Sequence, residues 1–330
     1  MRRTGLVGLA VACIAASAAQ AAEWRLQRIG TPARVSAIET ADKEVRIEAG
    51  GLWYALARKD EGLTLRYIDG VKARLPDRAL PDGSVTAGEH DIARAWLSDP
   101  TDRYDHGVLG DKIEAATVTL ETQDGKRFDV SLKNDAVFED LRPRIADLDG
   151  DGRDEAVVVK SYLKRGAALA VIAWRKNRYE IVAETPPSGA PNMWLAPAAI
   201  ADFLGDGQMA VAIVRQPHMV GQLELWSLRD GHLVKTGDMP DFSNHAIGSR
   251  AIGMSVAADF DGDGVIDLAL PSLDRMRLRI VSFHPQPREI ASIALPAMAA
   301  TDLGLVASEG TPLIVLGLSD GSLAVAEPAH

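Results

Sequence analysis

Two short stretches combine carboxylates and glycines at spacings that suit the binding of a cation. Each offers oxygen ligands at positions 1, 3, 5, 7 and 9, with a backbone carbonyl at position 7. In the first stretch these residues are Asp147, Asp149, Asp151, Arg153 and Glu155. In the second they are Asp259, Asp261, Asp263, Val265 and Asp267. Carboxylates at alternate residues of a tight loop converge, and this number of hard oxygen ligands favours Ca²⁺ over zinc or copper.

A third stretch, from Asp202 to Ala210, keeps only part of this ligand set. Asp202 and Asp206 remain, but Leu204 stands at position 3 and Ala210 at position 9. Two carboxylates are too few for Ca²⁺, which takes about six to eight oxygen ligands. We therefore expect two structural calcium sites and a metal-free third loop held by turn hydrogen bonds. The alternative for the two acidic stretches is a polar hairpin that binds no metal.

None of the three loops fits an EF-hand. Position 12 is Val158 in the first loop and Leu270 in the last, where an EF-hand places a bidentate glutamate. The flanking residues are short apolar runs typical of strands. Gly150 and Gly152 supply turning conformations that a side chain would resist.

The residues around the loops are patterned for strands rather than for helices. Beyond residue 21, no segment keeps an apolar i, i+3, i+4 pattern over three turns, and short apolar runs are broken by Gly, Asp, Asn and Pro. Asp-Gly pairs that suit tight hairpins stand at residues 69–70, 124–125, 230–231 and 320–321. The sequence therefore predicts an all-β, antiparallel fold.

The loops recur at regular intervals. They begin at Asp147, Asp202 and Asp259, with spacings of 55 and 57 residues, and a decayed copy begins at Asp302. In the first three copies, one apolar run precedes the loop and three follow it. Four strands per period of about 50 residues are typical of a β-propeller blade, whereas stacked β-sandwiches need about 100 residues per unit. We predict about six four-stranded antiparallel blades, with five or seven as the alternatives.

The first and last strands are expected to meet. The last repeat has only three apolar runs, at residues 297–301, 313–318 and 322–327, and Trp24–Ile29 is a strand with no repeat of its own. We predict that Trp24–Ile29 completes the last blade and closes the ring, which removes an exposed sheet edge. Between residues 33 and 141 the strand runs are fainter. Residues 71–89 are predicted to form an insertion or a long loop.

The acidic loop followed by a Val/Leu/Ala strand resembles the FG-GAP or VCBS-type repeat of integrin α-subunit propellers and of many secreted bacterial proteins. The resemblance covers residues 142–327. It implies calcium ions that brace the loops, and a propeller that mediates adhesion or ligand binding, although some members are lyases or other enzymes. Gly189-Ala190-Pro191 is similar to the family's second signature, but no Phe-Gly pair stands at a matching place, which favours the VCBS type.

Candidate catalytic residues are few. Two segments, at residues 103–107 and 244–250, each place a histidine in a loop shortly before a predicted strand. One hypothesis makes His106 and His245 an acid/base or binding pair at an axial funnel. In that hypothesis three arginines hold an anion: Arg103, Arg144 and Arg250. The alternative is that all of these are loop residues hydrogen-bonded to neighbouring blades.

Tryptophans could supply stacking platforms for a sugar. The candidates are Trp53, Trp96, Trp174, Trp194 and Trp226. Trp174 and Trp226 occupy equivalent strands of successive repeats, which indicates packing between blades. Trp194, in a loop before a strand, is the better candidate for exposure.

Residues 1–21 are predicted to be a secretory signal peptide. Basic residues precede an apolar stretch from Leu6 to Ala18, and Ala19-Gln20-Ala21 is a small-x-small cleavage site. The stretch is shorter than the roughly 20 residues of a spanning helix. We therefore expect residues 22–330 to form one propeller domain, secreted or periplasmic, with no membrane insertion after cleavage. Cys13 is the only cysteine, and its lipidation is the alternative.

The chain without this leader is acidic. Loss of Arg2 and Arg3 changes the formal net charge from −10 to −12. An acidic surface disfavours nucleic acid and anionic membranes as partners. We expect a calcium-braced binding or scaffold module for an unknown protein or carbohydrate ligand. The alternative is a calcium-dependent hydrolase or lyase with its site in the axial funnel.

Overall fold

The computed structural model describes residues 23–329, apart from 42–43, 60–61, 71–73 and 309. Within these ranges all regular elements are β-strands, as the sequence predicts, and there is no helix. It follows that the described chain has no helix long and apolar enough to cross a bilayer. The predicted signal peptide, including Cys13, lies outside the described residues.

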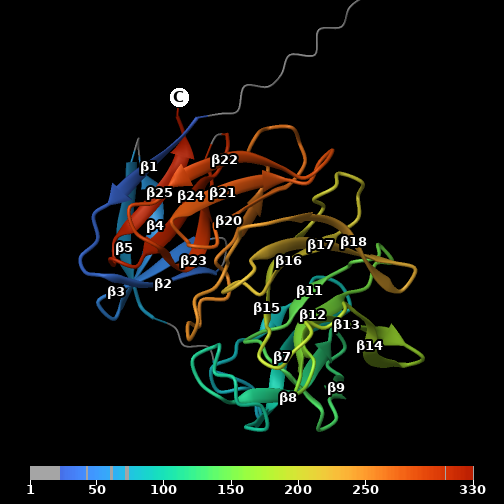
Figure 1. Cartoon of the computed structure of the whole chain (residues 1–330). Coiled ribbons are helices and arrows are strands. Elements are labelled where there is room, and N and C mark those ends of the chain that lie inside the picture. The colour runs from blue at the N-terminus through green and yellow to red at the C-terminus, as the bar shows by residue number, and fades with distance from the viewer. Residues whose placement is uncertain (1–22, 42–43, 60–61, 71–73, 309, 330) are drawn as a thin grey trace, which may run out of the picture.

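The strands form antiparallel sheets, four of which contain four strands each (Figure 1). The first sheet takes its strands in chain order: β2 (Val35–Ala41), β3 (Glu44–Ala49), β4 (Leu52–Lys59) and β5 (Gly62–Ile68). Every second residue of β3 is buried, namely Val45, Ile47 and Ala49. This alternation is the period of a strand with one face in the core.

A nine-stranded sheet follows, in the order β14-β13-β12-β10-β8-β7-β6, with β9 paired to β8 and β11 paired to β12. The short β10 pairs with both β8 and β12, and so joins two groups of strands. The strands before β10 are β6 (Thr86–Ala87), β7 (Ile92–Thr101), β8 (Glu114–Thr122) and β9 (Arg127–Ser131). From β10 onward they are β10 (Ala136–Phe138), β11 (Arg144–Ala146), β12 (Glu155–Tyr162), β13 (Gly166–Arg175) and β14 (Arg178–Glu184).

Two further four-stranded sheets follow in simple chain order. One consists of β15 (Leu195–Ala201), β16 (Ala210–Arg215), β17 (Gln222–Arg229) and β18 (His232–Met239). The other consists of β19 (Val256–Ala258), β20 (Asp267–Pro271), β21 (Arg277–Ser282) and β22 (Arg288–Ala294).

The last sheet combines the two ends of the described chain. Its strands are β23 (Ala299–Val306), β24 (Leu313–Leu318), β25 (Leu323–Pro328) and β1 (Trp24–Ile29). All six residues of β1 pair antiparallel with β25, from Trp24 opposite Pro328 to Ile29 opposite Leu323. Figure 1 shows the blue β1 beside the red β25. The predicted addition of Trp24–Ile29 to the C-terminal strands is therefore present.

Three of the four Asp-Gly pairs form the predicted hairpin turns. Gly125, Gly231 and Gly321 have φ values of +80°, +75° and +83°, which L side chains rarely adopt. They join β8 to β9, β17 to β18 and β24 to β25. The prediction is wrong for residues 69–70, because this pair follows β5, the last strand of its sheet. In the region predicted as an insertion or a long loop, residues 71–73 lie outside the described residues, and residues 74–89 contain β6 and an isolated bridge from Ala79 to Ser98 of β7.

Apolar side chains join each sheet to its neighbour. Phe203 and Phe283 meet edge to face at 6.0 Å between centroids, which joins the β15–β18 sheet to the β19–β22 sheet. Trp24 of β1 meets Phe260 in the same way at 5.8 Å. Strands β12 and β13 are buried almost throughout, as expected for strands covered on both faces.

Candidate functional site

The three loops predicted from sequence share one position in the fold. They connect β11 to β12, β15 to β16 and β19 to β20, each time the first two strands of a repeat. In all three loops the first aspartate accepts backbone N–H groups from the turn. Asp147 accepts from Gly150 and Gly152 at 2.8 and 2.9 Å, and Asp259 accepts from Gly262 and Gly264 at 2.7 and 3.0 Å.

The partial loop keeps the same backbone shape. Asp202 accepts from the backbone N–H groups of Asp206 and Gly207 at 3.1 and 2.9 Å. Gly205 and Gly207 have φ values of +67° and +81°, close to the +74° and +84° of the corresponding glycines in the first loop. The turn hydrogen bonds expected for this loop are therefore present. Since it lacks two of the carboxylates, the turn itself does not require the full ligand set.

The second residue of every loop points into the core. These residues are Leu148, Phe203 and Phe260, and each is at most 1% exposed. The loop is thereby fixed to the apolar interior on one side, while backbone N–H groups of the turn hold the carboxylate of its first aspartate.

Three carboxylates of the first loop converge. Asp147, Asp149 and Glu155 offer oxygen atoms that all lie within 4.8 Å of one another. Glu155 is buried, and its Oε2 accepts the backbone N–H of Leu148 at 2.9 Å. Burial raises the pKa of Glu155 to about 8, and the charges of the loop aspartates add to that rise. A divalent cation would relieve this repulsion, and the donor set of hard oxygens fits Ca²⁺.

The other acidic loop also brings three carboxylates together, but on a different subset of positions. Asp259, Asp261 and Asp263 converge within 4.8 Å. Asp267 is fully buried, and its Oδ2 accepts the backbone N–H of Phe260 at 2.9 Å. Its Oδ1 has no hydrogen-bond partner among the described residues. Burial raises the pKa of Asp267 to about 6.

A basic side chain distinguishes the two acidic loops. Arg288 of β22 donates to Asp261 at 3.0 Å and lies 3.7 Å from Asp263. In the described part of the chain, no such ion pair reaches the carboxylates of Asp147, Asp149 or Glu155. The charge of the first cluster is thus the less compensated of the two. Whether Arg153 and Val265 direct their carbonyls at the clusters stays a prediction.

The histidine candidates lie in a buried hydrogen-bonded network. His106 and Ser161 both hydrogen-bond to the carboxylate of Glu139, which is 0% exposed. Burial raises the pKa of Glu139. The carboxylate stands between the serine and the histidine, whereas activation of a serine nucleophile requires the imidazole in the middle. This order supports the interpretation of His106 as a hydrogen-bonded loop residue.

His245 also lies in the protein interior, in a second hydrogen-bonded group. It hydrogen-bonds to His218 at 2.9 Å and to the carbonyl of Ser249 at 2.9 Å. Burial lowers the pKa of both His218 and His245 to about 4, so both imidazoles are neutral at pH 7. His245 is 1% exposed and cannot meet a substrate in this conformation.

Trp194 is also buried, so the prediction that it is the exposed tryptophan is wrong. It is 3% exposed, it stacks with His218 at an interplanar angle of 11°, and its indole N–H donates to the carbonyl of Glu139 at 3.1 Å. The loop position suggested exposure. The indole instead fills the space between the two histidines and the backbone after β10.

The arginine candidates are engaged by the protein itself. Arg144 pairs with the buried Asp140 at 2.6 Å. Arg250 contacts both Asp82 and Asp111 at 3.1 Å, and Arg103 donates to the carbonyl of Ala136. Since carboxylates neutralise Arg144 and Arg250, the described contacts do not make these arginines an anion-binding set.

Several buried acids were not found from the sequence, and Glu114 is among those whose pKa burial raises most. Glu114, the first residue of β8, is 2% exposed. Burial raises its pKa to about 9, with a further contribution from the nearby Glu139. A single glutamate at the start of a strand carries no sequence signal of burial, so only the packing reveals it.

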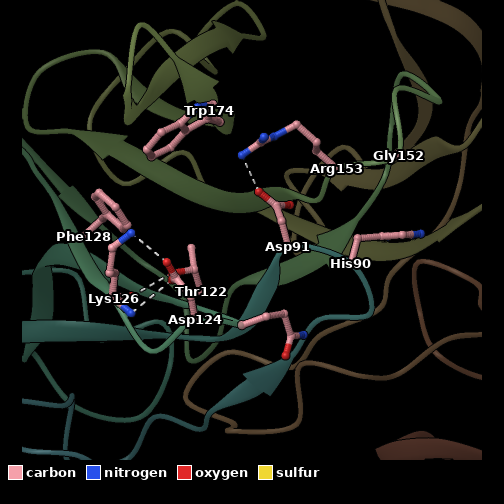
Figure 2. A pocket seen from close by; sticks show the side chains of 10 residues that line it. His90, Asp91, Thr122, Asp124, Lys126, Phe128, Gly152, Arg153 and Trp174 are labelled. Atoms are coloured by element: carbon pink, nitrogen blue, oxygen red, sulfur yellow. Dashed lines mark hydrogen bonds and ion pairs between the residues drawn. The ribbon is translucent and has the colours of Figure 1, made fainter.

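A pocket lies beside the first acidic loop (Figure 2). Its volume is about 580 Å³, within the range of about 300–1,000 Å³ that is usual for small-molecule sites. It is lined by residues from the β6–β7 turn, the β8–β9 hairpin, the acidic loop and β13: His90, Asp91, Thr122, Gln123, Asp124, Lys126, Phe128, Gly152, Arg153 and Trp174. Of these, the sequence singled out Gly152 and Arg153 of the acidic loop, Asp124 of an Asp-Gly pair, and Trp174.

Comparison with known proteins gives no family. No family model matches the chain, and no curated protein matches it. Among solved structures, an exotype rhamnogalacturonan lyase, YesX, aligns with a TM-score of 0.41 and 16% identity over 83% of this chain and 60% of that one. BBS1N, solved in complex with ARL6DN, aligns with a TM-score of 0.48 and 8% identity over 89% and 86%. This chain thus spans about three fifths of the lyase, and these similarities carry no argument about activity.

Proposed function

We propose that this protein is a calcium-braced β-propeller of the FG-GAP or VCBS type that acts as a binding module outside the cytoplasm. The four four-stranded sheets support four blades, and the nine-stranded sheet, in which β10 joins β6–β9 to β11–β14, supports two more. The pairing of β1 with β25 supports closure of a ring. The leader-like residues 1–21 and the acidic charge support export and a protein or carbohydrate ligand rather than nucleic acid.

The observation that carries the proposal is the recurrence of one loop at the same place in three successive repeats. In two of the three copies carboxylates converge to within 4.8 Å. These clusters join the end of one strand to the start of the next, so a bound Ca²⁺ would brace the strands rather than act on a substrate. The Ser161–Glu139–His106 order gives no reason to prefer the hydrolase or lyase alternative.

Calcium-dependent stability tests the proposal. Thermal unfolding is measured with 1 mM Ca²⁺ and with excess chelator. A cation present at 100 times its Kd stabilises the folded state by about 2.7 kcal/mol per site, which is a rise in Tm of several degrees for about 300 residues. The Asp149→Ala/Asp261→Ala double variant is expected to lose this response.

Asp206→Ala provides a matched control, because it removes a carboxylate from the loop that lacks the full ligand set. It is expected to keep the full response to Ca²⁺. Of the single variants, Asp149→Ala should reduce the response more than Asp261→Ala, since Arg288 already compensates part of the charge at the second cluster. Equal Tm values for the wild type with and without chelator would sink the calcium proposal.

A further inference from the structure

The pocket beside the first acidic loop has an apolar corner. Phe128 and Trp174 meet edge to face at 5.2 Å, and Trp174 and Tyr179 do so at 5.0 Å. Rings at such angles form a corner rather than two parallel walls, so they do not make a slot for a flat aromatic ligand. Arg153 also lies over the Trp174 ring, with its Cζ 5.4 Å from the centroid. The parts of Trp174 and Phe128 that line the pocket offer apolar surface against which the C–H groups of a saturated ring can pack.

The rest of the pocket lining pairs hydrogen-bond acceptors with donors. Asp91 faces Arg153 at 2.6 Å, and Asp124 faces Lys126 at 2.7 Å. Gln123, on the same hairpin, adds an amide that donates and accepts. Each cation is matched by a carboxylate, so the wall selects neither an anion nor a cation. Hydroxyl groups suit such a wall, because each can donate to a carboxylate and accept from a cation.

The acidic loop supplies part of this pocket directly. Gly152 and Arg153 line it, and the carboxylate of Asp91 accepts from the backbone N–H of Asp154 at 2.8 Å and from the hydroxyl of Tyr179 at 3.0 Å. Asp154, in turn, is buried and accepts from the backbone N–H of His90 at 2.9 Å. These bonds tie the loop to the β6–β7 turn, as Figure 2 shows for Asp91 and Arg153.

From this geometry we propose that the pocket binds a neutral saccharide, which packs against Trp174 and Phe128 and bonds through its hydroxyls to Asp91, Gln123 and Lys126. The proposal rests on the proposed function, because it names the ligand class of that binding module. It also makes saccharide affinity depend on the cation, since the loop that would hold Ca²⁺ supplies Gly152 and Arg153 to the pocket wall.

Affinity electrophoresis of the full chain tests the pocket. The native gels contain one neutral polysaccharide each (a β-glucan, a galactomannan, an arabinoxylan or dextran), and a further gel contains polygalacturonate as the acidic probe. Each is run with Ca²⁺ and with chelator. We expect at least one neutral polysaccharide to retard the wild type in Ca²⁺, with weaker retardation in chelator.

Two variants locate the binding. Trp174→Leu removes the stacking ring and should weaken binding about tenfold. Gln123→Ala/Lys126→Ala changes only the β8–β9 hairpin, where Lys126 is 71% exposed, so it keeps the test valid even if Trp174→Leu fails to fold. Trp226→Phe is the matched control, because Trp226 lies on the equivalent strand β17 but is 7% exposed and outside the pocket. It should bind as the wild type does.

The outcomes separate this inference from the calcium brace. Absence of retardation in every gel, with a Tm that still responds to Ca²⁺, would overturn the saccharide pocket and leave the brace intact. Retardation by polygalacturonate alone would overturn the neutral ligand, and retardation unchanged in both pocket variants would overturn the location. Retardation that is equally strong with Ca²⁺ and with chelator would overturn the proposed dependence of saccharide affinity on the cation.

Discussion

Replacement of Glu114 by glutamine should change how the stability of this protein depends on pH. Glu114 is 2% exposed, and its pKa is raised from 4.5 to about 9 by burial and by the nearby Glu139. The folded chain therefore keeps a proton on this side chain at neutral pH, whereas the unfolded chain loses it near pH 4.5. Glutamine is neutral at every pH and has nearly the same shape.

The sign and size of the effect follow from proton linkage. Between pH 4.5 and 9 the folded chain binds one proton more than the unfolded chain, so the free energy of unfolding falls as pH rises. The fall is about 1.4 kcal/mol per pH unit, or about 3 kcal/mol from pH 5 to pH 7. For about 300 residues this corresponds to roughly 5 °C in Tm. In Glu114→Gln the free energy of unfolding no longer falls with pH on account of this group.

The assay is thermal unfolding of wild type and variant at pH 5, 6, 7 and 8 with saturating Ca²⁺. The quantity to compare is the Tm difference between the two proteins, because groups that do not interact with Glu114 titrate equally in both. Glu121→Gln is the control. Arg94 and Arg127 lower the pKa of Glu121, so its Tm difference from wild type should stay constant above pH 5. If the Tm difference between Glu114→Gln and the wild type were the same at every pH, the conclusion that Glu114 is protonated in the folded chain would be refuted.

Two further predictions concern stability. Deletion of residues 22–31 exposes the edge of β25 and removes the contact between Trp24 and Phe260. It should therefore destabilise the folded state by more than the loss of one buried aromatic side chain, which costs about 3–5 kcal/mol. The measurement is the Tm of the deletion variant. Arg25→Ala, which breaks only an exposed ion pair with Glu327, should cost at most about 1 kcal/mol, and a deletion no worse than this would contradict the role of β1. Phe203→Ala should cost about 3–5 kcal/mol in urea unfolding. The partly buried Leu204→Ala should cost less, and equal costs would show that Phe203 does not anchor the loop.

The sequence predicted best the features that depend on interactions between residues a few positions apart in the chain. Alternating carboxylates and glycines in residues 147–155 and 259–267 predict a tight loop, because the aspartate at position 1 bonds to backbone groups only a few residues away. The strands could be predicted for a similar reason, because each run of apolar residues is interrupted where a turn begins. The partner of β1 could also be predicted, because one repeat lacked a strand and one strand lacked a repeat.

Features that depend on packing between distant segments could not be predicted. Burial of Trp194 and His245 arises from the space between repeats, and the pocket brings together residues from 90 to 174. The nine-stranded sheet depends on β10, whose three residues pair on both sides. Nothing in the residues Ala136–Phe138 distinguishes this strand from an ordinary short apolar run.

The pairing of β1 with β25 has a consequence for biosynthesis. Arg25 and Glu327 are 302 positions apart, so β1 leaves the ribosome long before the strand that covers it. At about 5–20 residues per second, that delay is roughly 15–60 s. During this interval the other sheets can form locally, but Trp24–Ile29 remains an unpaired, partly apolar segment of the nascent chain. A chaperone that protects exposed strands would therefore act first on the residues that fold last.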